Sequence, residues 1–92
     1  MAQAIFIPQN IFKVAGKGLV VSGSLKTGVL RPGMVAKIKS QKIPLISIEA
    51  FNKTAEEINE DDPAAKQFGI VLPETALKLL SSSKEIIFTE EK

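Results

Sequence analysis

The chain has 92 residues, of which 45% are hydrophobic and 24% charged, and it contains no Cys, His, Trp or Tyr. These values indicate one globular domain over residues 1–92, and they exclude disulfides, zinc sites of thiolate and imidazole, and catalysis by cysteine or histidine. No apolar run reaches the roughly 18 residues of a membrane helix, and the N-terminus lacks the basic start of a signal peptide. We therefore expect a cytoplasmic protein without membrane contact.

The net charge of +2 conceals an asymmetry between the two halves of the chain. Residues 1–48 contain seven basic residues and no acid, whereas residues 49–92 contain all ten acids and five lysines. If each half forms its own surface, the first half presents a basic face suited to a polyanion. The alternative is that the two halves interleave in space and neutralise each other.

Alternation of apolar and polar residues predicts strands along most of the chain. A period of two, typical of strands with one buried face, extends over residues 19–25, 34–39, 45–51 and 67–72. Residues 4–7, 11–15 and 85–89 are expected to complete the set. Short strands separated by turn signals predict an all-β fold. We expect a closed barrel of six or seven strands with its core at about residues 5–88, because closure removes exposed sheet edges.

Glycines mark the expected chain reversals, and one glycine-rich stretch raises the question of nucleotide binding. In GKGLVVSG, residues 16–23, Gly18 and Gly23 have the separation found in a Walker A loop. Ser24 and Leu25 stand where that loop requires Lys and Ser or Thr, so we expect a hairpin turn leading into a strand. Arg31–Met34, RPGM, fits a type II turn. The glycines interpreted as structural are Gly16, Gly18, Gly23, Gly28, Gly33 and Gly69.

Two segments interrupt the strand pattern. Residues 52–66, NKTAEEINEDDPAAK, predict an acidic loop with room for one turn of helix at residues 55–60. Residues 73–80, PETALKLL, predict a short helix that packs through Ala76, Leu77 and Leu80, since Pro suits the first helical position. The acids lack the spacing of a calcium loop. We therefore expect no metal site, no cofactor and no catalytic residue.

Cations dominate the candidate binding residues. Lys and Arg side chains of the first half are suited to contact the phosphates of RNA. Stacking on bases is disfavoured, because the core is expected to use most of the aromatic residues Phe6, Phe12, Phe51, Phe68 and Phe88. The candidate RNA-binding residues are Lys13, Lys17, Arg31, Lys37, Lys39 and Lys42.

The glycine and strand pattern resembles a known family. Residues 12–33, FKVAGKGLVVSGSLKTGVLRPG, are similar to the start of the second domain of elongation factor Tu and other translational GTPases. The similarity continues through IEAF, residues 48–51, and FGIVL, residues 68–72, and covers about residues 5–88. It implies the β-barrel of that domain, which packs on the GTPase domain. The positions that carry the first pattern are Phe12, Gly16, Gly18, Val20, Gly23, Gly28 and Gly33.

The resemblance also implies a binding pocket, because in the tRNA carriers of the family this barrel binds the aminoacylated 3′ end of tRNA. The pocket glutamate of the family matches Glu49, and Phe51 shares its strand face. Gln67 stands where the family has an asparagine, and the acidic loop is longer than in the bacterial factor. The alternation alone leaves Glu49 either exposed or in a pocket beside Phe51.

Two functions follow as expectations. The first is a non-enzymatic, translation-factor-like barrel that binds RNA, either tRNA-like or in a ribonucleoprotein, as a stand-alone protein or as part of a larger GTPase factor. The second is a protein-docking module without RNA contact. Its partner would be a GTPase domain or another protein, and the acidic loop would serve as the address.

Overall fold

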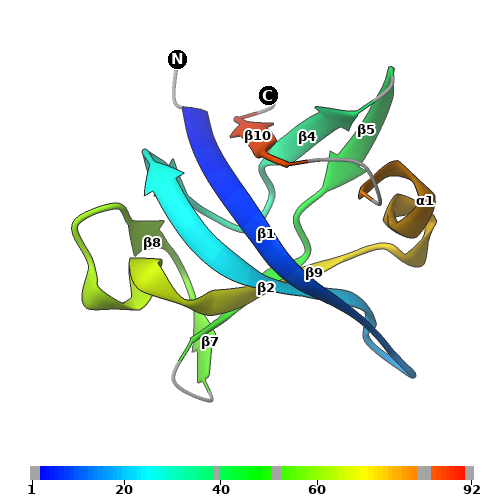
Figure 1. The fold of residues 1–92 in the computed structure, drawn as a ribbon, viewed down its shortest axis with the longest axis horizontal. Helices are drawn as coiled ribbons and strands as arrows, with labels where there is room; N and C mark the ends of the chain where they lie inside the picture. Colours follow the sequence, from blue (N-terminus) through cyan, green and yellow to red (C-terminus); the bar gives the residue numbers. More distant parts are fainter. Residues whose placement is uncertain (1–2, 39, 51–52, 81–83, 91–92) are drawn as a thin grey trace.

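Short strands joined by tight turns make up the computed structural model, which describes residues 3–38, 40–50, 53–80 and 84–90 (Figure 1). Lys39 and Phe51, two of the predicted binding residues, lie outside the described residues. The helical segments are η1 (Pro63–Lys66), η2 (Glu74–Ala76) and α1 (Leu77–Leu80). The strands are β1 (Gln3–Val14), β2 (Gly18–Thr27), β3 (Val29–Leu30), β4 (Val35–Ile38), β5 (Gln41–Pro44), β6 (Ser47–Ala50), β7 (Lys53–Ala55), β8 (Ile58–Asn59), β9 (Phe68–Leu72) and β10 (Ile86–Thr89).

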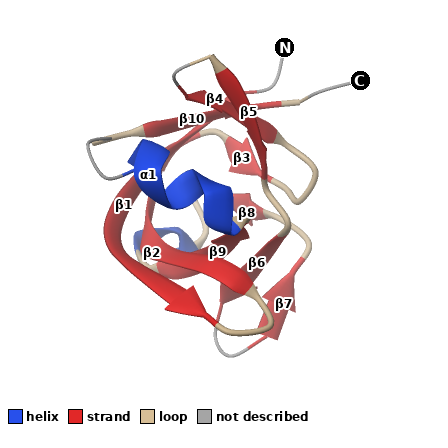
Figure 2. Ribbon diagram, turned by 90° about the vertical axis from the view of Figure 1, so that its right-hand side faces the viewer, coloured by secondary structure: helices blue, strands red, loops and turns tan. Residues whose placement is uncertain are grey.

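Eight strands form one antiparallel sheet in the order β5-β4-β10-β1-β2-β9-β6-β7, and β3 pairs with β8 in a second sheet. The all-β class predicted from the sequence is confirmed. The sheet curves back on itself, and α1 lies at one open end of it, as Figures 1 and 2 show, but closure is not confirmed, because over the described residues the sheet ends at β5 and β7. The described residues form ten strands, where six or seven were expected. Strands of two to four residues, such as β3 and β8, are too short to show an alternation.

β1 is one continuous strand of 12 residues where two separate strands were predicted. Its register with β2 shifts between Pro8 and Asn10, which marks a β-bulge. A bulge tolerates Pro8, which has no N–H for the ladder. The extra residue also changes the alternation, so that Phe6 faces the core before the bulge and Ile11 packs against the core after it.

The core lies between the curved strands and contains side chains from nearly every element. In β2, the alternating residues Leu19, Val21 and Leu25 are buried, as the period of two predicts. The rings of Phe6 and Phe68 meet edge to face with centroids 5.3 Å apart. One connected cluster of buried residues includes side chains from β1 to β10.

The acidic segment is more structured than a loop. Residues 52–66 contain β7, β8 and η1, and the predicted turn of helix at residues 55–60 is wrong, since β8 lies there. Ile58 enters the core with a relative exposure of 2%. The Asp62 side chain caps η1 by accepting a hydrogen bond from the Ala64 N–H at 3.3 Å. The acids therefore lie on a segment that is anchored by its apolar residues.

Two smaller expectations need correction. The helix predicted at residues 73–80 is present as η2 and α1, with Ala76 and Leu80 buried, but Leu77 is exposed. Before β6, Leu45 is buried and Ile46 is 51% exposed, so the alternation expected from residue 45 starts one residue out of phase. The reason is that residues 45 and 46 lie between β5 and β6 and belong to neither strand. Their backbone hydrogen bonds go to different segments: the Leu45 N–H donates to Met34 O, and the Ile46 N–H donates to Val71 O.

Candidate nucleic-acid interface

The glycine-rich stretch forms the β1–β2 hairpin turn and the strand that follows. The Lys17 N–H donates to Val14 O at 3.1 Å, which closes the turn. Gly18 has φ +111°, and a Cβ there would lie 2.8 Å from the carbonyl oxygen of Leu72. At Gly23 a Cβ would lie 2.0 Å from the carbonyl oxygen of Ile7. These glycines allow backbones to approach closely, and the stretch has the geometry of a hairpin rather than of a phosphate loop.

A row of side chains crosses the outer face of the sheet beside this hairpin. Phe12 pairs with Val20, Val20 with Val71, and Val71 with Ser47, in β1, β2, β9 and β6. We call these four residues the outer row. Since Leu19 and Val21 point into the core, Val20 points away from it.

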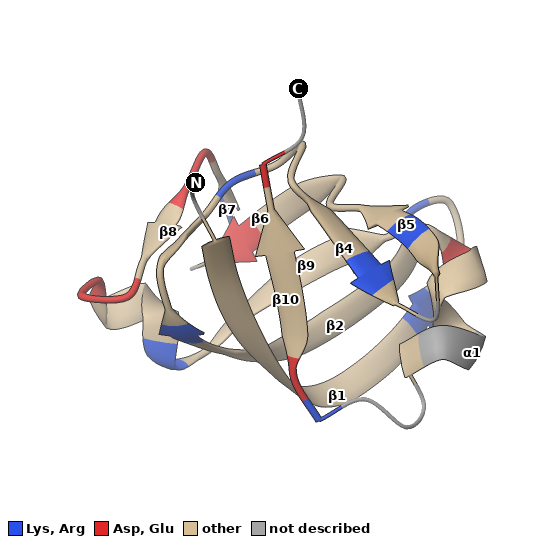
Figure 3. Ribbon diagram, turned by 90° about the horizontal axis from the view of Figure 1, so that it is seen from above, with Lys and Arg blue, Asp and Glu red and all other residues tan. Residues whose placement is uncertain are grey.

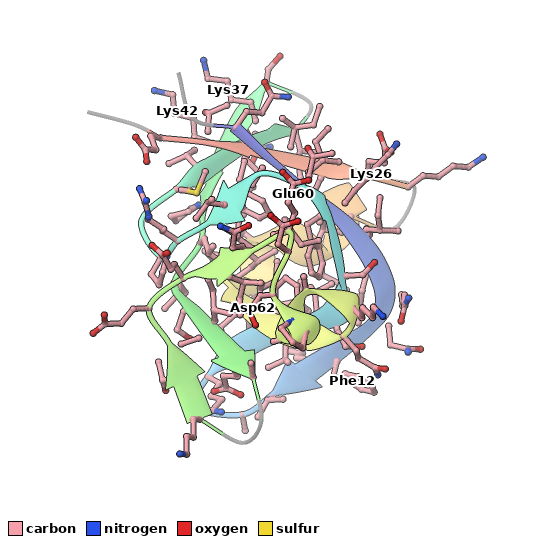
Figure 4. The ribbon with its side chains drawn as sticks, turned by 90° about the vertical axis from the view of Figure 1, so that its left-hand side faces the viewer. Phe12, Lys26, Lys37, Lys42, Glu60 and Asp62 are labelled. Carbon is pink, nitrogen blue, oxygen red and sulfur yellow. The ribbon has the colours of Figure 1, made fainter. Side chains whose placement is uncertain are left out.

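The outer row includes an exposed aromatic ring. Phe12 is 54% exposed, whereas Val71 is only 3% exposed, although it lies outside the connected core. Phe6, Phe68 and Phe88 lie in the core as expected of most of the aromatic residues, and Phe12 is an exception, because the bulge in β1 places it on the outer face. Figure 4 shows Phe12 on the surface, far from Lys37 and Lys42.

Glu49 lies next to the outer row and forms an ion pair with the hairpin. In the register, Glu49 pairs with Gly69 of β9 and Thr54 of β7. Lys17 Nζ lies 2.5 Å from Glu49 Oε2, so the lysine at the tip of the turn reaches the strand that carries the predicted pocket residue. Gln67 is exposed and precedes β9, two residues before Gly69 and hence on the same side. Glu49 and Gln67 thus share this face.

The basic half of the chain is interleaved with the acidic half. In every ion pair of the described residues, the cation comes from residues 1–48 and the acid from residues 49–92. Most of the expected basic surface is therefore neutralised locally, as the alternative interpretation predicted. The pairs are Lys13–Glu74, Lys17–Glu49, Lys26–Glu85, Arg31–Glu57 and Arg31–Glu90.

Arg31 is the cation with the most acidic surroundings. Its Nε donates to Glu57 at 3.0 Å and its Nη1 donates to Glu90 at 2.9 Å. The hydrogen bond and charge of Glu57, followed by the charge of Glu90, raise the pKa of Arg31 above its ordinary value. A phosphate that bound Arg31 would have to displace one of these carboxylates.

The remaining cations fall into two separate groups. Lys13 and Lys17 lie at the β1–β2 hairpin, beside the outer row. Lys37 and Lys42 face each other across β4 and β5. The predicted RNA-binding residues therefore do not form one surface, and the hairpin group is the one that lies beside an exposed aromatic side chain.

The carboxylates of the described segments hold no arrangement typical of a metal centre. No group of three His, Cys, Asp or Glu side chains comes together in this part of the chain. The turn after β8 is held by its own backbone and side chains, since the Asp61 N–H donates to Asn59 Oδ1 at 3.1 Å. Among the described helices, none is long and apolar enough to cross a membrane.

Comparison with known proteins shows which solved structures have a similar fold. No protein-family model matches the sequence. Among solved structures, translation elongation factor SelB from Methanococcus maripaludis, in its apo form, is similar with a TM-score of 0.70 and 20% sequence identity. The similarity covers 98% of this chain and 19% of the SelB chain, so this chain spans about a fifth of that protein. The chain therefore has the fold of one part of a translation elongation factor, which agrees with the second-domain barrel implied by the sequence resemblance.

Proposed function

We propose that this chain is a cytoplasmic, non-enzymatic, translation-factor-like β-barrel module that binds RNA. The bound part is a single-stranded RNA end, and it lies on the outer row between the β1–β2 hairpin and Glu49. The fold shared with a translation elongation factor supports the module. The observation that carries RNA binding is Phe12, an exposed aromatic ring on the outer face of the sheet, beside the hairpin turn that carries Lys17.

The chemistry of this face suits a nucleotide. An exposed aromatic ring stacks on a base of any sequence, which typically contributes about 1–3 kcal/mol per base. Lys13 and Lys17 lie at the same end of the sheet and can take the phosphates that flank that base. Gly69, which pairs with Glu49 in the register, adds no side chain beside that carboxylate.

The ion pairs of the two lysines do not prevent this role. Their side chains are exposed, by 64% for Lys13 and 49% for Lys17, and exposed pairs contribute only about 0–1 kcal/mol. A phosphate therefore competes readily with Glu49 for Lys17. Once released, the Glu49 carboxylate is an acceptor for a ribose hydroxyl, a group that distinguishes RNA from DNA.

Fluorescence anisotropy with a labelled eight-nucleotide RNA tests the proposal. Phe12→Ala should weaken binding by about 1–3 kcal/mol, roughly 5- to 150-fold. If Lys13 and Lys17 each bind one phosphate, replacing both with Ala should reduce the slope of log affinity against log salt by about 1.4, at about 0.7 per phosphate of a single strand.

Two controls are matched to these variants. Leu77→Ala removes an exposed apolar side chain from α1, and Arg31→Ala removes a cation that two acids already hold. Both should leave RNA affinity unchanged. The proposal fails if the RNA shows no salt-sensitive binding at low ionic strength, or if Phe12→Ala binds like the wild type.

The second candidate function, protein docking through the acidic segment, is favoured by one observation. In the described part of the chain, Glu56, Glu60 and Asp61 are exposed and take part in no ion pair. Deleting the segment would remove the buried Ile58, so the test should replace the three acids with Gln, Gln and Asn. Loss of partners in a pull-down, together with no salt-sensitive RNA binding by the unmodified chain, would favour docking over RNA binding.

A further inference from the structure

Val71 is buried on the outer face of the sheet, although most of its neighbours there are small. It is 3% exposed and lies outside the connected core. Its cross-strand neighbours are Val20 on one side and Ser47 on the other, and Gly69 precedes it on the same face. Serine and glycine are too short to enclose a valine side chain. Another group therefore lies over Val71.

The ion pair between Lys17 and Glu49 passes over this position. The turn that carries Lys17 lies level with residue 73, one step beyond the end of the β2–β9 register, whereas Glu49 lies level with residue 69. Four residues of a strand span about 13 Å, so the two side chains must extend toward each other to bring Lys17 Nζ to Glu49 Oε2. Of the β9 residues between these levels, Val71 alone points away from the core, since the residue on each side of it belongs to the core cluster.

Lysine is suited to cover an apolar neighbour. Its four-carbon stem packs along apolar surface while the ammonium group stays in contact with water. The side chains of Lys17 and Glu49 are both partly exposed, as expected of a pair that lies on the sheet surface. The stem of Lys17 accounts for the burial of Val71, so the pair closes the middle of the outer row.

We propose that the Lys17–Glu49 ion pair is a strap that closes the outer row in the free chain and opens when an anionic ligand takes Lys17. Opening exposes Val71 and releases the Glu49 carboxylate in one step. The ligand is the RNA of the proposed function, so the inference rests on that function for the identity of the ligand. The strap itself belongs to the free chain, where it can be measured without RNA.

The strap depends on two charges at the surface and is therefore easy to open. Exposed ion pairs contribute little to stability and are screened by salt. Figure 3 shows acidic and basic positions interspersed around the molecule rather than gathered in one patch. Removing either charge of the pair should thus be enough to open the strap.

Solvent exposure of the Val71 methyl groups, measured by NMR on the full chain, tests the strap without RNA. A neutral, water-soluble gadolinium chelate enhances the relaxation of methyl groups that it can approach. Lys17→Ala and Glu49→Gln should each raise the enhancement at Val71 at least twofold. In the wild type, 1 M NaCl should raise it as well, whereas Lys17→Ala should show no further increase.

Two matched variants change neighbouring groups and leave the strap in place. Lys13→Ala breaks the other ion pair of the hairpin, in which Lys13 Nζ lies 3.8 Å from Glu74 Oε2. Ile46→Ala shortens an exposed side chain beside Val71, to whose carbonyl oxygen the Ile46 N–H donates. Neither should change the enhancement at Val71. An increase with Ile46→Ala as large as with Lys17→Ala would identify Ile46 as the cover and overturn the proposal.

Fluorescence anisotropy with the labelled eight-nucleotide RNA separates the strap from RNA binding. Glutamine keeps an acceptor oxygen for a ribose but releases Lys17, so Glu49→Gln should bind RNA about two- to fivefold more tightly than the wild type. Unchanged or weaker binding would show that the pair does not oppose the ligand, and would overturn the proposal.

The two experiments fail in different ways. If neither protein binds RNA but Val71 becomes exposed in the variants, the proposed function is contradicted and the strap is supported. If Val71 stays protected in Lys17→Ala, the strap is removed altogether, whatever RNA binds.

Discussion

At the scale of single residues, Gly23 shows most clearly how the sequence determines the packing. It lies in β2 where β1 crosses at its bulge, and a Cβ there would come within 2.0 Å of Ile7 O and 2.9 Å of the Phe6 ring. Gly23→Ala should therefore lower the free energy of unfolding by about 2–3 kcal/mol or more, since backbone atoms must move. Urea denaturation followed by circular dichroism measures the change.

Gly69 provides the matched control for this prediction. It also lies inside a strand, but a Cβ there would make only ordinary contacts, the closest at 3.7 Å to Val20 Cγ1. Gly69→Ala should change the free energy of unfolding by less than about 0.5 kcal/mol. Equal effects of the two substitutions would show that crowding at the crossing does not explain Gly23.

Phe12 marks the limit of prediction at this scale. The motif containing it was visible in the sequence, and so was the hairpin that follows. The exposure of Phe12 could not be predicted from the sequence, because the strand was expected to break after residue 7. The only local signal was Pro8 within an otherwise apolar alternation, which is compatible with either a strand end or a bulge. Only the pairing with β2 distinguishes the two.

At the scale of elements, β8 makes the acidic segment part of the folded core. Its two residues place Ile58 in the cluster of buried side chains. Ile58→Ala should destabilise the protein by about 2–4 kcal/mol, whereas Glu56→Ala, two residues earlier and exposed, should cost less than about 0.5 kcal/mol. Thermal unfolding of both variants gives the comparison, and similar melting temperatures would contradict the assignment of Ile58 to the core.

The longer strands could be predicted and the shorter ones could not. β2 follows the period of two closely, since one of its faces lies in the core. β9 departs from it at Val71, which is buried although it faces away from the connected core. β3, β7 and β8 have two or three residues each, so their pairing depends on distant partners rather than on local pattern. The helical segment after Pro73 was predicted because Pro and the apolar residues that follow it give a local signal.

At the scale of the whole molecule, ion pairs join the two halves of the chain without dominating its stability. Arg31 is the clearest case, since it contacts Glu57 and Glu90 from distant segments. Arg31→Ala should lower the midpoint of urea denaturation only slightly, because all three side chains are about half exposed and exposed ion pairs contribute little to stability. The difference from the wild type should shrink in 1 M salt, where screening is strong.

Denaturation of both proteins at low and high salt checks this expectation. Arg31→Lys is the control. Lysine keeps the positive charge but lacks the planar guanidinium group, whose two nitrogens donate to Glu57 and Glu90. A loss that is equally large at both salt concentrations would mean that Arg31 acts through packing rather than charge. The charge asymmetry is visible in the sequence, but whether it produces a basic face or neutralisation between the two halves depends on which strands become neighbours.

The position of β10 in the sheet also determines when folding can finish. This strand contains the last described residues of regular structure, yet it pairs with β1 on one side and β4 on the other. A chain emerging from the ribosome therefore holds β1 and β4 with open edges until residues 86–89 have been released. The β1–β2 hairpin can form early because its partners are adjacent in sequence. The sheet becomes continuous only when β10 is inserted between β1 and β4.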